Sequence, residues 1–396
     1  MKKIFIIIII FLIPNLVLAS DFKKIKKKAT VNNPEIIFSI PKDLTGCQTK
    51  MRVSLKYTKV PPILKLDAPE GYGLDDRFSD SLSKFDEFSF PCGTGNKEAC
   101  ESVVKILLDW SNANAAKRTG PSDEEGKHWN DTLTVNLFVS SPMMAAYSFA
   151  KQVIDVPTDQ DKKIKEWFKK IVKKNQHLMY GKTYDYGGAS GTPKRAHNHA
   201  LSSAVAHMEL GVLIGDDKTF RKAFKNFEAA IKYSRKDGSL PIETRRGGRA
   251  MFYQARAMNA LAAIAIIAEN QGYDIWSYKH KNKDFHNLVK FFIDVTEKNE
   301  LIFKYAKESR HPGPAKDYKK QDLKIKTSSN WGWLYAYASR FPDHQNIKRL
   351  EKWSNGEAEL NPYQTKIVHH FRNIGNRPFG SATWSVVEPN CHSVKK

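Results

Sequence analysis

The chain has 396 residues, of which 41% are hydrophobic, so it can bury a sizeable core in one large domain or two ordinary ones, and a wholly disordered chain is excluded. Lysine and arginine total 64 against 42 acidic residues, and the formal net charge is +22. A field of this sign attracts polyanions. Nucleic acid, anionic membrane and acidic polysaccharide are therefore the candidate partners, and a merely solvated lysine-rich surface is the alternative.

The first 19 residues have the pattern of a secretory signal peptide. Lys2 and Lys3 precede an apolar run over residues 4–18, and Ala19 is the small residue expected before a cleavage site. The run is short for a membrane-spanning helix, and no later stretch is apolar for long enough, so we expect a mature chain without a membrane span. Export to the periplasm or beyond makes nucleic acid a poor partner.

Four cysteines in an oxidising compartment favour two disulfides, for which three pairings exist. We predict Cys92–Cys100, because the seven residues between them include two glycines and an asparagine and can turn back. We also predict Cys47–Cys391, which ties the two ends of the chain together. The cysteine spacings do not fit a zinc site, and no metal is expected.

The region between the leader and residue 97 is expected to be largely irregular. Residues 20–55 are lysine-rich and then mixed, and we interpret them as an N-terminal arm. Residues 56–97 contain four prolines and four glycines, which indicates a long loop that acts either as a lid or as plain surface wrapping. We interpret residues 56–396 as a single domain that ends in an irregular C-terminal tail over residues 341–396.

Helical periodicity dominates from Lys97 onward. Apolar residues recur at helical spacing in four segments, which predicts amphipathic helices over 103–110, 164–171, 220–231 and 285–295. Three further segments are apolar on more than one face, which predicts inner helices over 131–154, 199–213 and 249–270. No sustained strand pattern is present. The alternation of the two kinds of helix predicts an all-α fold of helical hairpins.

Tryptophans at two places are candidates for a sugar-binding cleft. Trp129 lies in a polar stretch just before an inner helix, and Trp331 and Trp333 lie in an aromatic run that ends at Tyr337. Core packing is the commoner fate of such side chains, so a buried helix is the favoured interpretation of the second run.

A glycine pair, Gly247 and Gly248, precedes the predicted inner helix that begins near Arg249. In that helix Tyr253 lies one turn after Arg249, and Arg256 lies about one turn further on. Nearby positive charge favours the phenolate form of a tyrosine, so Tyr253 is a candidate base.

A second candidate site segment is a glycine-rich loop that enters a helix near His197. Asn198 and His199 begin this helix, and helix N-termini favour anions such as carboxylates. A capping or core role is the alternative for His199. A metal site of His197, His199 and His207 fits no common spacing.

Together the two segments resemble the alginate lyase family, in its periplasmic, mannuronate-specific type. The resemblance covers roughly residues 55–340 and rests on Asn198-His199 before an apolar helix, Leu240-Pro241-Ile242-Glu243, Arg246-Gly247-Gly248-Arg249-Ala250 and Tyr253. The family usually has a second asparagine where this chain has His197, and histidine is common in place of Gln254. Because these residues flank the catalytic positions, the departures affect the expected identity of the substrate more than the expected reaction.

The resemblance implies an incomplete (α/α) toroid and a β-elimination on a uronate polymer, with no metal or organic cofactor. By analogy, Asn198, His199 and Arg246 neutralise the C5 carboxylate, which makes the C5 proton more acidic. Tyr253 is then both base and acid when the proton and the leaving oxygen lie on the same face of the sugar, as in mannuronate. His199 is the alternative base for guluronate.

By the same analogy, Arg249 and Arg256 favour the phenolate of Tyr253 and bind the acidic polysaccharide, together with Trp129. A monomer is expected. Two other functions stay open: the same elimination on a different acidic polysaccharide, and a non-catalytic periplasmic protein that binds polyanions.

Overall fold

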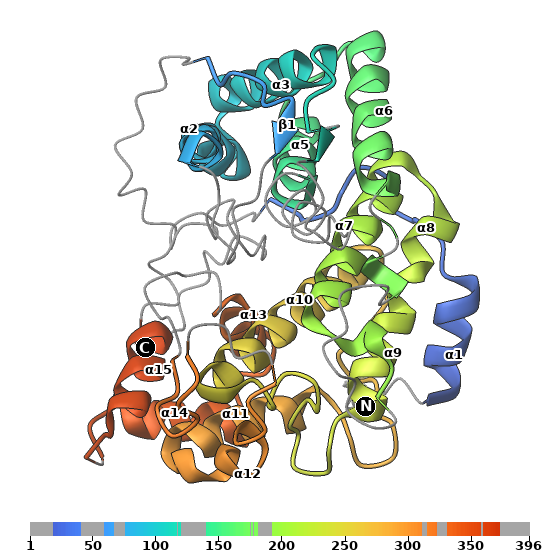
Figure 1. Cartoon of the computed structure of the whole chain (residues 1–396). Coiled ribbons are helices and arrows are strands. Elements are labelled where there is room, and N and C mark those ends of the chain that lie inside the picture. Colours follow the sequence, from blue (N-terminus) through green and yellow to red (C-terminus); the bar gives the residue numbers. More distant parts are fainter. Residues whose placement is uncertain are drawn as a thin grey trace, which may run out of the picture.

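The computed structural model describes residues 19–40, 59–66, 76–116, 118–119, 140–174, 176, 178–180, 192–310, 315–322, 331–357 and 359–372. In these residues the fold is helical, as predicted, apart from one short parallel pair formed by β1 (Lys65–Leu66) and β2 (Arg118–Thr119). Figure 1 shows α2, α3, α5 and α6 at one end, α7 to α10 in the middle with α13 beside α10, and α11, α12, α14 and α15 at the other end. The predicted signal peptide lies outside the described residues, except for Ala19.

Two inner helices form the centre of the fold. They are α7 (Asn198–Ile214) and α10 (Ala250–Asn270), which pack against each other. The stretch Gly247–Asn270 is long and apolar enough to cross a membrane, but 94% of its most apolar window is buried inside the protein. The apolar character of α10 is therefore explained by its place in the core. A third inner helix, α5 (Ser141–Val153), packs against α7, so all three predicted inner helices are confirmed within the described residues.

Amphipathic helices surround these inner ones. They are α3 (Lys97–Asn112), α6 (Thr158–Lys174), α8 (Asp217–Lys222), α9 (Phe224–Tyr233) and α11 (Phe285–Glu297). Helix α6 is typical, because it buries Ile164, Trp167, Phe168 and Ile171 and exposes lysines on its other side. Consecutive helices pack as pairs, such as α2 with α3 and α7 with α8, which confirms the predicted hairpins.

The C-terminal part packs on the core. It contains α12 (Phe303–Ala306), α13 (Gly332–Arg340), α14 (Gln345–Ser354) and α15 (Pro362–Arg372). Trp331 and Trp333 are buried with their rings edge-on to Phe292, so the core interpretation of this aromatic run is confirmed. The short 3₁₀ helices are η2 (Leu178–Tyr180), η3 (Lys194–Ala196), η4 (Gly247–Arg249) and η5 (Asn299–Ile302).

Three expectations of irregular structure are wrong in part. Helix α2 (Asp76–Gly93) occupies much of the predicted loop over residues 56–97, and it includes Pro91. That proline lies in the last turn, where the loss of one backbone donor is outweighed by burial of side chains such as Phe85 and Phe88. The N-terminal arm begins with α1 (Ala19–Lys28), and the predicted tail contains α14 and α15.

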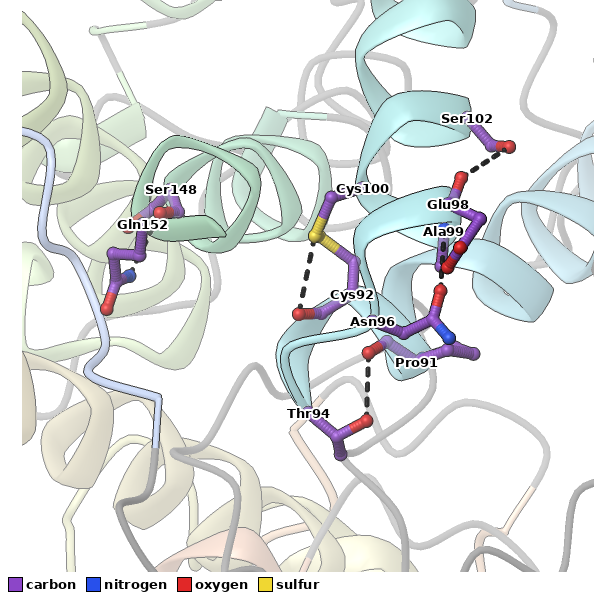
Figure 2. The surroundings of a disulfide bond; sticks show 10 residues. All are labelled: Pro91, Cys92, Thr94, Asn96, Glu98, Ala99, Cys100, Ser102, Ser148 and Gln152. Atoms are coloured by element: carbon purple, nitrogen blue, oxygen red, sulfur yellow. Dashed lines mark hydrogen bonds between the residues drawn. A yellow bond between two sulfur atoms is a disulfide. The ribbon is translucent and has the colours of Figure 1, made fainter. Parts of the chain in front are cut away.

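The helices α2 and α3 are joined by the predicted disulfide Cys92–Cys100 (Figure 2). The turn between them is held by Thr94, whose Oγ1 donates to the Pro91 carbonyl oxygen at 2.8 Å. It is also held by Asn96, whose Oδ1 accepts from the backbone N of Ala99 at 2.8 Å and caps α3. The second predicted pair, Cys47–Cys391, lies outside the described residues.

Candidate active site

The first component of the candidate site is the N-terminal turn of α7. His197 is its N-cap residue, and Asn198 and His199 are its first two residues. All three side chains are buried. The rings of His197 and His199 lie 4.5 Å apart, edge to face. The helix therefore presents an amide and an imidazole together at its positive end, as the sequence indicated.

Glu243 holds this turn in place, and its role was not recognised from the sequence. Its Oε1 accepts from the backbone N of Asn198 at 2.7 Å, and its Oε2 accepts from Asn198 Nδ2 at 2.7 Å. The carboxyl group is fully buried, and its Oε1 lies 3.9 Å from His197 Nε2. One signal was present in the sequence: an acid, Glu243, lies two residues before the arginine pair Arg245-Arg246.

The segment that carries Glu243 is fixed by Gln254 of α10. The Gln254 Oε1 accepts from the backbone N of Leu240 at 2.9 Å, and its Nε2 donates to the Gly238 carbonyl oxygen at 3.2 Å. Gly238 has a φ of +90°, and a Cβ there would lie 1.9 Å from the Asn287 carbonyl oxygen, so only glycine fits. Gln254 is fully buried and supports the site from behind.

The second component is the pair Arg246 and Tyr253. The guanidinium carbon of Arg246 lies 3.6 Å from the centre of the Tyr253 ring. Arg246 precedes η4, and Tyr253 lies in the first turn of α10. The cation against the phenol ring is therefore Arg246, where helical spacing had suggested Arg249. The Tyr253 hydroxyl has no hydrogen-bond partner in the described part of the chain.

Arg249 is instead directed to a short segment over residues 315–322, which we call the strap. Its Nε lies 3.6 Å from Asp322 Oδ2. The backbone N of Gly248 donates to the Ala315 carbonyl oxygen at 2.9 Å, and the Gln321 Nε2 donates to the Gly247 carbonyl oxygen at 3.0 Å.

The close approach of the strap requires glycine at position 248. A Cβ on Gly248 would lie 2.7 Å from the Asp317 carbonyl oxygen and 2.8 Å from the Lys320 carbonyl oxygen. The glycine pair therefore does more than break the helix, because it lets the strap hold the turn that carries Arg246.

The pKa values of the buried groups show that they form one electrostatic cluster. Burial lowers the pKa of His199 well below its ordinary value, and the nearby charges of His197, Arg246 and Arg256 lower it further, so the imidazole is neutral. Burial raises the pKa of Glu243 to about 7, against the opposing effects of Arg246, the hydrogen bonds from Asn198, and Arg256. Because Arg246 and Arg256 act on both groups, all four lie in one neighbourhood.

The predicted catalytic side chains Asn198, His199, Arg246 and Tyr253 are each at most 3% exposed. The half-buried residues beside them are Phe252, whose ring lies 5.1 Å from that of Tyr253, and Arg256, whose guanidinium carbon lies 5.6 Å from the Phe252 ring. Phe252 and Arg256 are thus more exposed than the four candidate catalytic side chains. Trp129 lies outside the described residues.

The arrangement suits acid–base chemistry on an anion. A buried guanidinium, a neutral imidazole and a helix N-terminus all stabilise negative charge, and they are worth most where water is excluded. A phenol stacked on the same guanidinium is placed to exchange a proton. Among the described residues, no three histidines, cysteines or carboxylates lie close enough together to hold a metal ion.

Comparison with known proteins agrees with this arrangement. The family model described as alginate lyase matches residues 93–303, more than half of the chain. An alginate lyase of Pseudomonas syringae pv. syringae is 25% identical over 278 residues, which are 68% of this chain and 64% of that protein. A polysaccharide lyase of Stenotrophomonas maltophilia is 27% identical over 184 residues, 46% of this chain and 47% of that protein. The chain thus spans about half to two thirds of the length of these relatives.

The fold is similar to that of solved structures. Alginate lyase A1-III complexed with a tetrasaccharide, in a tyrosine-to-phenylalanine variant, superposes with a TM-score of 0.64 at 18% identity and covers 92% of this chain and 99% of that chain. Alginate lyase A1-III from Sphingomonas species A1 gives a TM-score of 0.59 at 19% identity, over 94% and 95% of the two chains. The likeness confirms the predicted (α/α) toroid. With the family match over more than half of its residues, the chain belongs to the alginate lyase family.

Proposed function

We propose that this protein is a polysaccharide lyase that cleaves alginate, in particular its mannuronate blocks, by β-elimination. The observation that carries the proposal is the Arg246 guanidinium 3.6 Å from the Tyr253 ring, in the same buried cluster as His199. The membership of the family and the lyase names of the relatives support it. The predicted signal peptide supports action in the periplasm or outside the cell.

The reaction begins with the C5 carboxylate of a uronate against Arg246 and the N-terminus of α7. Arg246 can form a bidentate pair with it, and the neutral imidazole of His199 can donate a hydrogen bond. As the C5 proton leaves, negative charge spreads onto the carboxylate oxygens, which is where these donors are aimed. The stabilisation by these donors is therefore stronger in the transition state than in the bound substrate, and this difference lowers the activation free energy.

Tyr253 is the proposed base and acid. Its phenolate removes the C5 proton, and the phenol then returns a proton to the C4 oxygen as the glycosidic bond breaks. One residue can do both when the two groups lie on the same face of the ring, as in mannuronate. Proton transfer of this kind contributes about 10²–10⁴-fold. For guluronate, where the two groups lie on opposite faces, the neutral His199 is the alternative base.

Access to the site requires chain movement, because the four groups are nearly buried. A polymer entering beside Phe252 and Arg256 meets the half-buried edge of the cluster first. Arg256 therefore remains a proposed substrate-binding residue. For Arg249, the ion pair with Asp322 competes with such a role.

The test is to incubate the full-length protein with polymannuronate, polyguluronate and other uronate polymers and to follow the ultraviolet absorbance of 4,5-unsaturated ends. We expect the fastest formation of these ends with polymannuronate. Cleavage of only a different acidic polysaccharide would change the substrate, and binding of all polymers without unsaturated ends would indicate a non-catalytic polyanion-binding protein.

A further inference from the structure

Glu243 is a buried carboxyl group that the proposed reaction does not use. Both of its oxygens are engaged by Asn198, through the backbone N and the side-chain Nδ2, each at 2.7 Å. It is fully buried. Its charge acts on Arg246 and lies near His197, and its two hydrogen bonds tie it to Asn198.

The hydrogen bonds to Glu243 determine which end of the Asn198 side-chain amide remains available to a ligand. An ionised carboxylate only accepts hydrogen bonds, so the NH₂ end of the amide must face it. The same Asn198 Nδ2 lies 3.1 Å from His197 Nε2. In the tautomer in which His197 Nε2 is the acceptor, the second hydrogen of Asn198 Nδ2 is donated to it. What remains is Asn198 Oδ1, which is buried and has no hydrogen-bond partner among the described residues.

A buried acceptor without a donor is costly, so its presence beside a candidate site indicates that a ligand supplies the donor. A carboxylate cannot do so, because it brings only acceptors. A sugar hydroxyl or a protonated carboxyl group can. Asn198 had been expected to donate to the C5 carboxylate, but the contacts leave that role to Arg246 and His199.

We propose that Glu243 is a positioning residue that fixes the Asn198 amide with Oδ1 toward the bound sugar, where it accepts a hydrogen bond from a hydroxyl or a protonated carboxyl group. The inference rests on the proposed lyase function, since it names a contact in the same site. It assigns to Asn198 the recognition of a donor on the sugar, and to Glu243 the control of that recognition.

This control depends on protonation. The pKa of Glu243 is raised to about 7 by burial, against the charges of Arg246 and Arg256 and the bonds from Asn198. His197 also faces this group, with its Nε2 3.9 Å from Glu243 Oε1, and the neutral ring of His199 lies next to that of His197. Above pH 7 the ionised carboxylate holds the NH₂ end of Asn198. Below pH 7 the protonated carboxyl can donate to Oδ1, which frees the amide to turn. The orientation of the Asn198 amide with Oδ1 toward the sugar is therefore gained as the pH rises through about 7.

The experiment compares the wild type, Glu243→Gln and Glu209→Gln across a pH series on both sides of 7, with kcat and KM measured on polymannuronate. Glu209 is a matched control, because it is also a fully buried carboxyl, but it lies on α7 about 16 Å further along from Asn198. We expect a rise in wild-type kcat/KM centred near pH 7. In Glu243→Gln this rise should vanish, and kcat/KM above pH 7 should fall roughly tenfold, the size of one lost hydrogen bond. In Glu209→Gln the rise should remain.

A uniform loss in Glu243→Gln with the rise near pH 7 intact would overturn the proposal, because it would indicate a purely structural role. Glu243→Asp is the second variant in case Glu243→Gln does not fold. The aspartate keeps the charge but is too short to reach both Asn198 nitrogens. Its kcat/KM should therefore be lower than that of the wild type but should still change with pH. Equal activity of Glu243→Asp and the wild type would also overturn the proposal.

Failure of the proposed function gives a different result. If the wild type forms no unsaturated ends on any polymer, the lyase assignment fails, and the same three proteins are compared by calorimetric titration with a mannuronate oligosaccharide. Binding that strengthens through pH 7 in the wild type and in Glu209→Gln, but not in Glu243→Gln, would support the positioning role. Binding with the same pH dependence in all three would overturn it.

Discussion

Two buried carboxyl groups differ in their surroundings: Glu243, which packs against the first turn of α7, and Glu209, which lies in the C-terminal half of α7. At the N-terminal end, Glu243 accepts two hydrogen bonds from Asn198 and feels the charges of Arg246 and Arg256. In the C-terminal half, Glu209 accepts one hydrogen bond, from Ser141 Oγ at 2.9 Å, and its Oε2 has no hydrogen-bond partner in the described part of the chain.

The difference shows what makes a buried acid responsive to pH. Burial alone raises the pKa of Glu209 well above its ordinary value, opposed only by the Ser141 hydrogen bond, so this group stays protonated. Burial with nearby cations and amide donors leaves the pKa of Glu243 at about 7. The surroundings at the N-terminal end of α7 thus leave a buried acid able to titrate near pH 7, whereas the surroundings of Glu209 keep it protonated. The following changes test that contrast, from the largest expected effect to the smallest.

Removal of the Tyr253 hydroxyl from the candidate site should have the largest effect on kcat. In Tyr253→Phe we expect kcat to fall by roughly 10³-fold or more, because the proton carrier is lost, while the ring still packs on Arg246 and polymer binding is retained. Unsaturated-end formation and affinity electrophoresis measure the two quantities. Tyr147→Phe is the matched control, because that buried hydroxyl on α5 bonds Asp161 at 2.7 Å, and its loss should change stability but not kcat. Comparable kcat values for Tyr253→Phe and the wild type would remove Tyr253 from the mechanism.

Substitutions of the two arginines beside the glycine pair, Arg246 and Arg249, should differ in their effect on kcat. Arg246→Ala should lower kcat by roughly 10²–10³-fold, because it removes the charge that faces the developing anion. Arg249→Ala breaks the ion pair with Asp322 and should change kcat less than about tenfold. Steady-state kinetics on polymannuronate decides between them. Equal losses of kcat would contradict the distinction between the two arginines, and a change in KM alone for Arg246→Ala would mean that Arg246 only binds substrate.

The contact between the strap and Gly248 should be sensitive to a single methyl group. Gly248→Ala places a Cβ against two carbonyl oxygens and should reduce the free energy of unfolding by about 1–3 kcal/mol. Gly215→Ala, at the C-terminal end of α7, is the comparison. That glycine has a φ of +66° but nothing within 4 Å of its Cβ position, so only backbone strain applies, about 1–2 kcal/mol. Urea unfolding measures both. Activity should fall in Gly248→Ala alone.

The smallest effect on activity is expected at Glu209, where the change concerns only stability. The folded protein keeps the proton on Glu209, whereas the unfolded chain loses it above a pKa of about 4.5. Wild-type stability should therefore fall as the pH rises above that value, by about 1.4 kcal/mol per pH unit, until the folded pKa is reached. Glu209→Gln lacks this slope. Unfolding free energies at two pH values measure it, and parallel changes in both proteins would show that Glu209 is ionised in the folded state.

The helices and the site differ in how far the sequence could predict them. Periodic apolar residues were sufficient for α6 and α10, because those helices are stabilised by the faces they bury. The proline and glycines in residues 56–97 concealed α2, whose stability comes from tertiary burial of Phe85 and Phe88. Local propensity does not contain that contribution.

In the site, the sequence marked the reacting groups but not their support. Asn198 and Glu243 are 45 residues apart, and nothing local to either predicts their contact. Helical spacing pointed to Arg249 as the neighbour of Tyr253, but the stacked cation is Arg246, from the turn before the helix. Loop residues approach a helix by tertiary packing, which periodicity cannot reveal.

The account is tested most directly by a crystal structure of the Tyr253→Phe variant with a bound mannuronate oligosaccharide. We predict that one C5 carboxyl group lies within hydrogen-bonding distance of Arg246 and His199, with a sugar hydroxyl or protonated carboxyl on Asn198 Oδ1 and the ring at position 253 facing C5. An oligosaccharide bound away from these four side chains, or a cluster that stays closed to it at saturating concentration, would contradict the account.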